Sequence, residues 1–387
     1  MGISVGIVGL GAFGSEFVDL FFHHPLVDRI ALCDREPKKL AEFAQKESLR
    51  KKFDPSDAYE SLAALCRSDI QCVALFTQHW LHAIQAVEAM EAGKHVYSAV
   101  PVLCRPDGDE ILEWCDRLVE TCVRTGQHYM FGETTYYRPE AQFCRRQAAA
   151  GAFGDFMYAE GEYIHDVDSG YNLRDVIRWR LSSTAGREWA EELKRYDARG
   201  IIDGPMHYPT HSTSGPISVM KAHAVRVWAL PWYNRAHDEF FGKQPSNETA
   251  LFAMSNGACM RICEHRDIGH PGREMFRVYG TKGSFEHEQW CERLSSRPVP
   301  EEEMRDPLPP EVEAAYEAGL GRDRFRGGHG GSHAYLIHEF VSAIAADRRP
   351  VINAWEAVRY MVPGVMAHKS ALRDGEVLEV PDWGDAP

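Results

Sequence analysis

Two histidines four positions apart are the residues of this chain whose type and spacing could most plainly do chemistry. His207 and His211 lie in the stretch MHYPTHSTSGP, residues 206–216, which also carries Tyr208 and several small hydroxyl side chains. Histidine transfers protons near neutral pH and binds metals, and residues four apart share one face of a helix. The stretch is therefore open to three interpretations: a reaction centre, a metal site, or the start of an ordinary helix.

A metal pair is the least favoured of the three. Pro209 stands between the histidines, which suits the first turn of a helix, and no third ligand follows at a spacing typical of zinc sites. We therefore predict no metal, a His211 that is either reactive or merely structural, and a supporting His207 near the substrate.

The chain opens with an apolar run followed by a glycine pattern. Residues 3–8 are typical of a buried parallel strand, GLGAFG follows, and a helix pattern covers residues 12–22. In this G-x-G-x-x-G arrangement Gly9 permits a tight turn, Gly11 lets a pyrophosphate approach the backbone, and Gly14 lets helix and strand pack closely. Because the helix N-terminus would face the phosphates, the pattern predicts a bound nicotinamide dinucleotide.

An acidic residue at the end of the second strand bears on which dinucleotide is bound. The strand predicted at residues 29–33 ends in Asp34, which follows Gly14 by 20 positions. A carboxylate there accepts hydrogen bonds from the adenosine ribose and repels a 2′-phosphate, which favours NAD over NADP. Arg35, next to it, is a feature that favours a phosphate.

Strands and helices continue to alternate up to residue 133. We predict strands at 73–76, 95–98 and 128–133 and helices at 82–94 and 109–126. This order is typical of a doubly wound parallel sheet, whose strand ends line the cofactor crevice. The cofactor-binding residues that we predict are Gly9, Gly11, Ala12, Phe13, Gly14, Asp34, Arg35, Thr77, His79, His82, Ser98 and Val100.

Beyond residue 133 the pattern changes. We predict helices at 139–150, 333–347 and 354–372 and strands at 156–166, 224–232, 248–265 and 275–288. The period of two in these strands predicts an open, mainly antiparallel sheet with one face free for a substrate. The expected fold class is an α/β Rossmann domain, residues 1–133, followed by an α+β open-sheet domain, residues 134–387, whose C-terminal helices pack back.

Composition excludes some classes of partner. Lys+Arg 43 and Asp+Glu 57 give a net charge of −14, which argues against a nucleic-acid binder. No basic segment precedes the first strand, no apolar run approaches the roughly 20 residues of a membrane helix, and the ten cysteines form no CxxC pair. We therefore expect a cytoplasmic protein with reduced thiols and no membrane partner.

Motifs spread over nearly the whole chain resemble one oxidoreductase family. The glycine pattern, the block HAIQAVEAMEAGKHVYSAVP at 82–101, the hairpin YGTKGSFE at 279–286 and the closing helices resemble the glucose–fructose oxidoreductase, inositol dehydrogenase and MocA (Gfo/Idh/MocA) family. The resemblance implies that a small sugar substrate binds between the open sheet and the nicotinamide of NAD. It also implies a homodimer or homotetramer built through that sheet.

Two places depart from the typical dehydrogenases of that family. Ala99 and Val100 stand where those enzymes carry Glu-Lys before a proline, so the lysine that moves the proton of the alcohol is missing. His207 and His211 stand where they carry Asp and His on a helix. Of these standard groups, only His211 remains.

A second resemblance fits the departures. EGEYIHD at 160–166, RWRL at 178–181 and YPTH at 208–211 resemble the redox-assisted glycosidases such as glycoside hydrolase family 109. The resemblance implies that tightly held NAD oxidises C3 of a sugar, a base removes the C2 proton and the aglycone leaves from C1. Water then adds and the hydride returns. The segment 182–205 is longer than we expect in that group.

The same resemblance assigns catalytic roles. His211 would act at O3 and Tyr163 as the base at C2, with His329 of the loop RGGHGGSH on the leaving-group side. Tyr163 could instead only fill the sheet core, and the glycine loop could be a lid or a plain connector. The residues that we predict around the substrate are Glu133, Tyr137, His165, Arg178, Arg180, His207 and Tyr208.

A basic run over residues 178–199 is open to two interpretations. Its arginines and lysine alternate with glutamates, as on a solvated helix face. Alternatively, an arginine fork binds an anionic group of the sugar, and Arg180 is then the first choice. A sulfoquinovoside is the leading substrate on that interpretation, and neutral N-acetylhexosaminides remain open.

Three functions are therefore in competition. An NAD-recycling glycosidase would cleave glycosides without accumulating NADH, and an NAD-dependent sugar dehydrogenase would form NADH stoichiometrically. A sugar-sensing protein would bind both ligands and turn nothing over; the many polar residues at predicted strand and helix ends argue against it.

Overall fold

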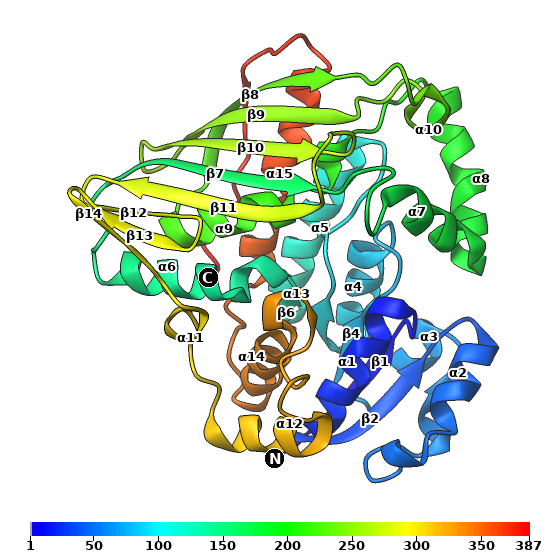
Figure 1. Cartoon of the computed structure of the whole chain (residues 1–387). Helices are drawn as coiled ribbons and strands as arrows, with labels where there is room; N and C mark the ends of the chain where they lie inside the picture. The colour runs from blue at the N-terminus through cyan, green and yellow to red at the C-terminus, as the bar shows by residue number, and fades with distance from the viewer. Residues whose placement is uncertain (1) are drawn as a thin grey trace.

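Two β-sheets organise the protein in the computed structural model, which describes residues 2–387. Figure 1 shows a parallel sheet with helices at the N-terminal end of the chain and a broad second sheet above it. The predicted fold class, a Rossmann-like domain followed by an open-sheet domain, is confirmed. The predicted boundary at residue 133 stays a prediction.

The parallel sheet has six strands in the order β3-β2-β1-β4-β5-β6. Its strands are β1 (Ile3–Val8), β2 (Val27–Cys33), β3 (Ala58–Tyr59), β4 (Cys72–Leu75), β5 (His95–Ser98) and β6 (Tyr129–Phe131). Its helices are α1 (Ala12–His23), α2 (Pro37–Ala44), α3 (Leu62–Cys66), α4 (His82–Glu91) and α5 (Gly108–Thr125). The reversal of strand order between β1 and β4 creates the crevice in which such sheets bind dinucleotides.

Local signals account for where these elements begin and end. The central strands β1 and β4 are almost wholly apolar and buried, as strands covered on both faces must be. Helix α5 begins at Asp107, whose side chain accepts a hydrogen bond from the backbone N–H of Asp109, and it ends at Gly126 in the left-handed conformation. The predicted strands and helices of this region lie where expected, with ends displaced by a few residues.

The second sheet has nine strands in the order β14-β13-β12-β11-β7-β10-β9-β8-β15. Its strands are β7 (Phe156–Ile164), β8 (Ala224–Trp232), β9 (Asn247–Met254), β10 (Cys259–His265), β11 (Arg273–Gly280), β12 (Gly283–Glu286), β13 (Gln289–Glu292), β14 (Ser295–Pro298) and β15 (Leu378–Glu379). All neighbouring pairs are antiparallel except β7 with β10.

The helices of this part are of unequal length. They are α6 (Pro139–Ala149), α7 (Leu173–Ser182), α8 (Thr184–Ala198), α9 (Thr210–Met220), α10 (Asp238–Phe241), α11 (Glu301–Met304), α12 (Pro310–Leu320), α13 (Gly328–Gly331), α14 (His333–Ala345) and α15 (Ala354–Ala371). Helix α9 lies on the inner face of the sheet, against β7 and β11. Helix α15 packs beside α9 and against β8. Helices α12 and α14 pack back on α1.

Helix α9 is buried along its whole length although it is rich in hydroxyl groups. Backbone carbonyls accept hydrogen bonds from its hydroxyls: Ser212 donates to Pro209, Thr213 to Tyr360 and Ser218 to Gly215. Buried polar groups cost little when they are paired in this way. The small side chains also let the helix approach the sheet closely.

The stretch 206–216 does not form one continuous helix. His207 ends a 3₁₀ turn, Pro205–His207, and α9 begins at Thr210. His207 and His211 therefore do not share a helix face. His207 binds Asp203 and His211 binds Glu133, 2.9 and 3.0 Å away. Among residues 2–387 no group of three or more histidine, cysteine, aspartate or glutamate side chains is placed to hold a metal ion.

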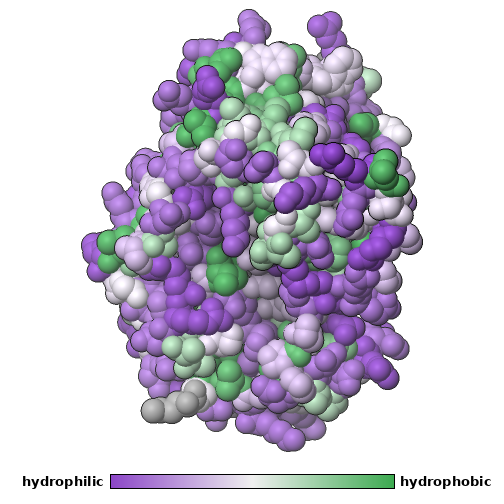
Figure 2. Space-filling view, turned by 90° about the vertical axis from the view of Figure 1, so that its left-hand side faces the viewer, coloured by the Kyte–Doolittle hydropathy of each residue, from purple (hydrophilic) through white to green (hydrophobic). Residues whose placement is uncertain are grey.

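The outer face of the large sheet exposes apolar side chains on β8 and β9. Trp228, Leu230, Trp232 and Leu251 all lie open to solvent. Figure 2, which views a different side of the molecule, is mainly hydrophilic, with apolar and intermediate residues grouped in its upper part. Assembly through the open sheet stays a prediction. No helix within the described part of the chain is long and apolar enough to cross a membrane.

Close contact between α9 and the sheet leads to a first prediction. A Cβ added at Gly161 of β7 would lie 1.8 Å from the carbonyl oxygen of Ser212. We expect Gly161→Ala to push α9 away from the sheet and to lower the free energy of unfolding by about 1–3 kcal/mol, as measured by urea denaturation. Gly269→Ala is the control, because no atom lies within 4 Å of its added Cβ; equal effects of the two substitutions would contradict the prediction.

Candidate active site

The glycine pattern forms an open cradle at the start of α1. Gly9 has a φ of +92°, and a Cβ there would meet the carbonyl oxygen of Phe76 at 2.8 Å. A Cβ at Gly14 would lie 2.0 Å from the carbonyl oxygen of Gly9. At Gly11 the space is open, and the nearest atom to an added Cβ is Nζ of Lys39, 3.8 Å away. The turn thus requires glycine at two positions and leaves room for a ligand at the third.

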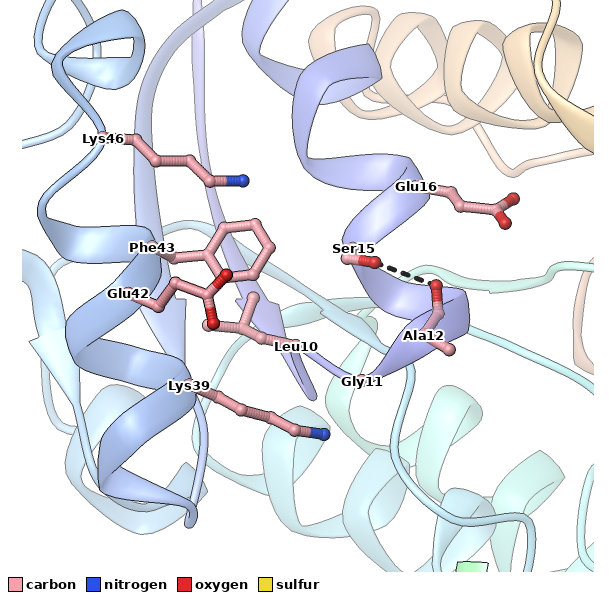
Figure 3. A pocket seen from close by; sticks show the side chains of 9 residues that line it. All are labelled: Leu10, Gly11, Ala12, Ser15, Glu16, Lys39, Glu42, Phe43 and Lys46. Carbon is pink, nitrogen blue, oxygen red and sulfur yellow. Dashed lines mark hydrogen bonds between the residues drawn. The ribbon is translucent and has the colours of Figure 1, made fainter. Parts of the chain in front are cut away.

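A cavity of about 430 Å³ extends from this cradle towards α2. Figure 3 shows Lys39 and Phe43 of α2, and Lys46 just after this helix, facing Gly11 and Ala12 at the start of α1. The first turn of α1 carries no capping side chain, so its backbone N–H groups are free to bind an anion. With Lys39 close by, the residues present fit the pyrophosphate of a dinucleotide.

Asp34 and Arg35 lie at the end of β2, next to the cradle. The Asp34 carboxylate accepts hydrogen bonds from the backbone N–H groups of Leu10 and Glu36, at 2.7 and 2.8 Å. These bonds fix the carboxylate at the end of β2, beside the glycine turn. Arg35 turns to Glu188 of α8, with two hydrogen bonds of 2.9 and 2.7 Å, and is therefore not free to bind a 2′-phosphate.

The other cofactor residues predicted from sequence divide into two groups. Thr77 and His79 are partly exposed in the loop after β4. His82 and Ser98 are buried and make hydrogen bonds to backbone carbonyls, His82 to Pro101 and Thr77, Ser98 to Ala99. These bonds hold the loops in place, and contact of His82 and Ser98 with the cofactor stays a prediction.

A buried ion pair joins the parallel sheet to α9. Glu133, just after β6, is fully buried, and its Oε1 atom lies 3.0 Å from Nδ1 of His211. Burial disfavours the charged imidazole, but the carboxylates of Glu133 and, less strongly, Glu274 outweigh it and raise the pKa of His211 to about 9. The backbone N–H of Thr135 also donates to Glu133. His211 is thus oriented, charged at neutral pH in the free protein, and able to exchange a proton through Nε2.

A second proton-transfer pair faces the first. The Tyr163 hydroxyl lies 3.0 Å from Nδ1 of His165, whose Nε2 lies 2.8 Å from the carbonyl oxygen of Tyr171. That carbonyl requires a proton on Nε2, so Nδ1 accepts from Tyr163. Burial and then Arg266 lower the pKa of His165 to about 4, which keeps it neutral. The ring centroids of Tyr163 and His211 are 5.1 Å apart.

Side chains from distant segments pack around these two pairs. Tyr208 packs against both Tyr163 and His211 and donates its hydroxyl to the carbonyl oxygen of Val100. The ring of His329 stacks over His211 with centroids 6.4 Å apart and meets Phe13 of the glycine loop edge-on. The loop around His329 therefore reaches from the cofactor cradle to the reactive histidine.

Three residues predicted around the substrate lie elsewhere. Tyr137 stacks on Tyr335 of α14, away from His211. Arg178 is exposed on the outer side of α7, where it pairs with Asp175. His207 is fully buried against Asp203 and His368. Arg180, in contrast, points inward and lies 2.9 Å from Nδ1 of His79.

The structure also brings in residues that sequence reasoning missed. Glu274 of β11 lies directly opposite Tyr163 in the sheet and forms an ion pair with Arg138. Arg266 lies over the Tyr163 ring at 4.7 Å and is held by the buried Glu264. Arg138, Glu274 and Arg266 each fall one position outside a helix or strand predicted from sequence, so no local pattern pointed to them.

The His211–Glu133 pair generates a prediction about proton affinity. We expect Glu133→Gln to lower the pKa of His211 well below 9, because burial remains while the carboxylate charge is lost. An NMR titration of ¹³C-labelled histidine, with the signal assigned from His211→Asn, measures this. An unchanged pKa would contradict the assignment.

The same pair has a consequence for stability. Since folding raises the pKa of His211, its contribution is fully present below the unfolded value of about 6.5 and is lost as pH rises through about 9. Denaturation of the wild type between these limits should show this loss. Glu133→Gln should flatten it.

Comparison with known proteins gives the site its family context. Residues 3–133 match the model of an oxidoreductase family with an NAD-binding Rossmann fold, Gfo/Idh/MocA. A glycosyl hydrolase family 109 protein of Streptomyces niveus is 27% identical, covering 98% of this chain and 77% of the relative. One of Bacteroides thetaiotaomicron is 24% identical, covering 98% and 84%.

Solved structures support the fold over its full length. Levoglucosan dehydrogenase in complex with NADH has a TM-score of 0.73 at 19% identity, covering 99% of this chain and 100% of that one. Scyllo-inositol dehydrogenase from Lactobacillus casei, with bound NAD(H) and scyllo-inositol, has a TM-score of 0.67 at 16% identity, covering 98% and 99%. Residues 3–133 thus match the Gfo/Idh/MocA oxidoreductase family, and over 98% of its length the chain is similar to family 109 glycosyl hydrolase proteins.

Proposed function

We propose that this protein is an NAD-dependent glycosidase that oxidises a hexoside at C3, eliminates its aglycone, adds water and restores the hydroxyl. One observation carries the proposal: two proton-transfer pairs, Glu133–His211 and His165–Tyr163, face each other across one site. A simple alcohol dehydrogenation needs a single group that accepts a proton, whereas an elimination needs a second base one carbon away. The names of the similar glycosyl hydrolases support the same choice.

The chain's own groups fit the steps in order. Bound NAD would supply the hydride acceptor for C3 and the hydride donor for the last step. His211 first gives to solvent the Nε2 proton that it carries in the free protein, and it then takes the O3 proton as the carbonyl forms. The ketone acidifies the C2 proton, and Tyr163 removes it as the phenolate, whose formation burial opposes by raising the pKa of the phenol. The C1–O bond then breaks, and the aglycone leaves with a proton supplied from the His329 side.

The second half runs these transfers in reverse. Water adds to C1 of the unsaturated ketone, with the proton on Tyr163 returning to C2. The hydride returns to C3 while His211 gives the proton back to O3. Atoms and electrons then balance as glycoside plus water giving sugar plus alcohol. At the position of the missing lysine Val100 is apolar and buried, so the proton transfer at O3 falls to His211.

A sugar dehydrogenase is the second candidate. It is favoured by the likeness of the fold to levoglucosan and inositol dehydrogenases and by the His211–Glu133 pair, which can serve oxidation without Tyr163. The two functions differ in their products, so incubation of purified protein with nitrophenyl glycosides in heavy water separates them. Nitrophenol release, deuterium at C2 of the freed sugar and no accumulation of NADH are expected. NADH accumulation with no elimination would establish the dehydrogenase instead.

Substitution of the proposed C2 base separates the two half-reactions. We expect Tyr163→Phe to lower nitrophenol release by about 10²–10⁴-fold, the usual contribution of a general base, while single-turnover oxidation at C3, followed as NADH absorbance, persists. Tyr171→Phe is the control, because Tyr171 is 70% exposed and contacts His165 through its backbone oxygen. Parallel loss of oxidation and elimination in Tyr163→Phe would reject Tyr163 as the C2 base.

The choice of sugar rests on Arg180. Arg180 lies against His79, whose pKa is lowered by burial and then by Arg180 itself, so the neutral ring accepts from the guanidinium. We propose that this guanidinium binds an anionic substituent, with a sulfoquinovoside as the leading substrate and an N-acetylhexosaminide as the neutral alternative.

Arg180→Met should then raise KM for the sulfoquinovoside about 10–100-fold, as loss of a charged hydrogen bond does. Arg178→Met, on the exposed side of the same helix, should leave KM unchanged; equal effects on neutral glycosides would reject an anionic substrate.

A further inference from the structure

Helices α7 and α8 form an excursion from the open-sheet domain to the parallel sheet. They lie between β7 and α9 in the chain, and α8 accounts for most of the segment 182–205, whose role the sequence leaves open. Figure 1 shows the pair standing apart from the large sheet, on the side of α2, α3 and α4. The contacts of α8 fall on three loops of the parallel sheet.

The first contact is with the loop after β2. Glu188 holds Arg35 with two hydrogen bonds, and the backbone N–H of Thr184 donates to Oε1 of Glu36 at 2.9 Å. These two residues directly follow Asp34, the residue expected to bind the adenosine ribose. The Arg35–Glu188 pair is half exposed, so it contributes about 0–1 kcal/mol on its own.

The second contact is a tryptophan stack on the loop after β4. The rings of Trp80 and Trp189 lie 5.1 Å apart and nearly parallel, at 8°. Both are buried, and with Tyr196 they form an apolar cluster separate from the main core. Stacked aromatic pairs contribute roughly 0.5–1.5 kcal/mol beyond the area that they bury, so this cluster is the main anchor of α8.

The third contact is with the loop after β5. Arg105 forms an ion pair with Glu110 at the start of α5, and Tyr196 donates its hydroxyl to the same carboxylate. Arg105 also lies 3.5 Å from Glu192, and Arg199 lies 2.9 Å from Asp107. Arg105 and Asp107 belong to the loop, and Glu192 and Tyr196 belong to α8, which Arg199 directly follows. The loop is therefore bound to the helix.

We propose that α8 is a clasp that retains the dinucleotide between turnovers. The loops after β2, β4 and β5 stand at the carboxyl ends of parallel strands, where this class of sheet binds its ligand. One helix of the other domain binds all three, so separating the domains to release the cofactor requires breaking its contacts. The inference rests on the proposed NAD site, and it deepens the proposed function: a recycling glycosidase gains from a cofactor that stays, whereas a dehydrogenase must exchange it each turn.

The rate of NADH release tests the clasp directly. Protein loaded with NADH is mixed with excess NAD, and NADH fluorescence reports dissociation in the absence of any sugar. We expect Trp189→Ala to release NADH at least about tenfold faster, which corresponds to about 1.4 kcal/mol. Trp179→Ala is the matched control, because this tryptophan of α7 is 54% exposed; its release rate should equal that of the wild type.

A second variant covers the case in which Trp189→Ala unfolds the protein. The double variant Glu188→Gln, Glu192→Gln removes the ion pairs to Arg35 and Arg105 from exposed positions and leaves the apolar cluster intact. We expect it to speed release several-fold, while Glu191→Gln, whose partner Lys194 lies on α8 itself, has no effect. Equal release rates in all folded variants would overturn the clasp.

The outcomes also separate the clasp from the proposed function. Slow release by the wild type that the variants accelerate, together with no cleavage of any glycoside, would support the clasp and reject the glycosidase. Cleavage with fast release by the wild type would reject the clasp alone. Failure to bind NADH at all would overturn the clasp and the proposed cofactor together.

Discussion

The buried pair of Glu133 and His211 is the interaction on which the rest of this site depends. Glu133 follows the last strand of the parallel sheet, and His211 lies on the helix that packs inside the open sheet. Two charges removed from water are stable only when each is paired and well hydrogen-bonded. The pair therefore sets how the two sheets are placed relative to each other and, at the same time, orients a proton-transfer group at their junction.

Close packing around α9 makes that placement possible. Gly161 on β7 and Gly215 on the helix remove the side chains that would otherwise separate helix and sheet, and the hydroxyls of Ser212 and Thr213 donate to backbone carbonyls. The inner face of the sheet then presents Tyr163 to His211 at ring-contact distance. The guanidinium of Arg266 lies against the face of the Tyr163 ring, and its charge is compensated by Glu264. Burial raises the pKa of Glu264 to about 7, even though Arg266 and Ser212 oppose that rise.

The electrostatics of the site fit chemistry in which protons move in both directions. Oxidation of one sugar carbon needs one proton acceptor, but the structure provides two oriented pairs, Glu133–His211 and His165–Tyr163. In the first pair the charges of the two partners compensate each other, and in the second His165 is neutral. Arg180 and His79 mark one side of the site, and Arg138 and Glu274 mark the side near Tyr163. This separation gives a substrate an orientation. The helix α8 adds a physical link between cofactor loops and substrate domain that the dehydrogenase-like fold does not by itself require.

The glycine pattern, the strand–helix alternation and the period-two strands were sufficient to predict the fold from sequence alone. These features are local: a turn at Gly9 needs glycine whatever surrounds it, and a buried parallel strand such as 3–8 is apolar throughout. The motif YPTH likewise identified His211 as a candidate before any geometry was known.

What only the tertiary structure decided was which side chains meet. Tyr137, His207 and Arg178 lie close in sequence to site residues but face away from the site. In contrast, Arg138 pairs with Glu274, 136 positions along the chain, and Arg266 lies against Tyr163, 103 positions away. Side-chain direction follows from helix phase and strand register, and a one-residue change in either turns a side chain from the site to the core. No local sequence pattern determines that phase or that register.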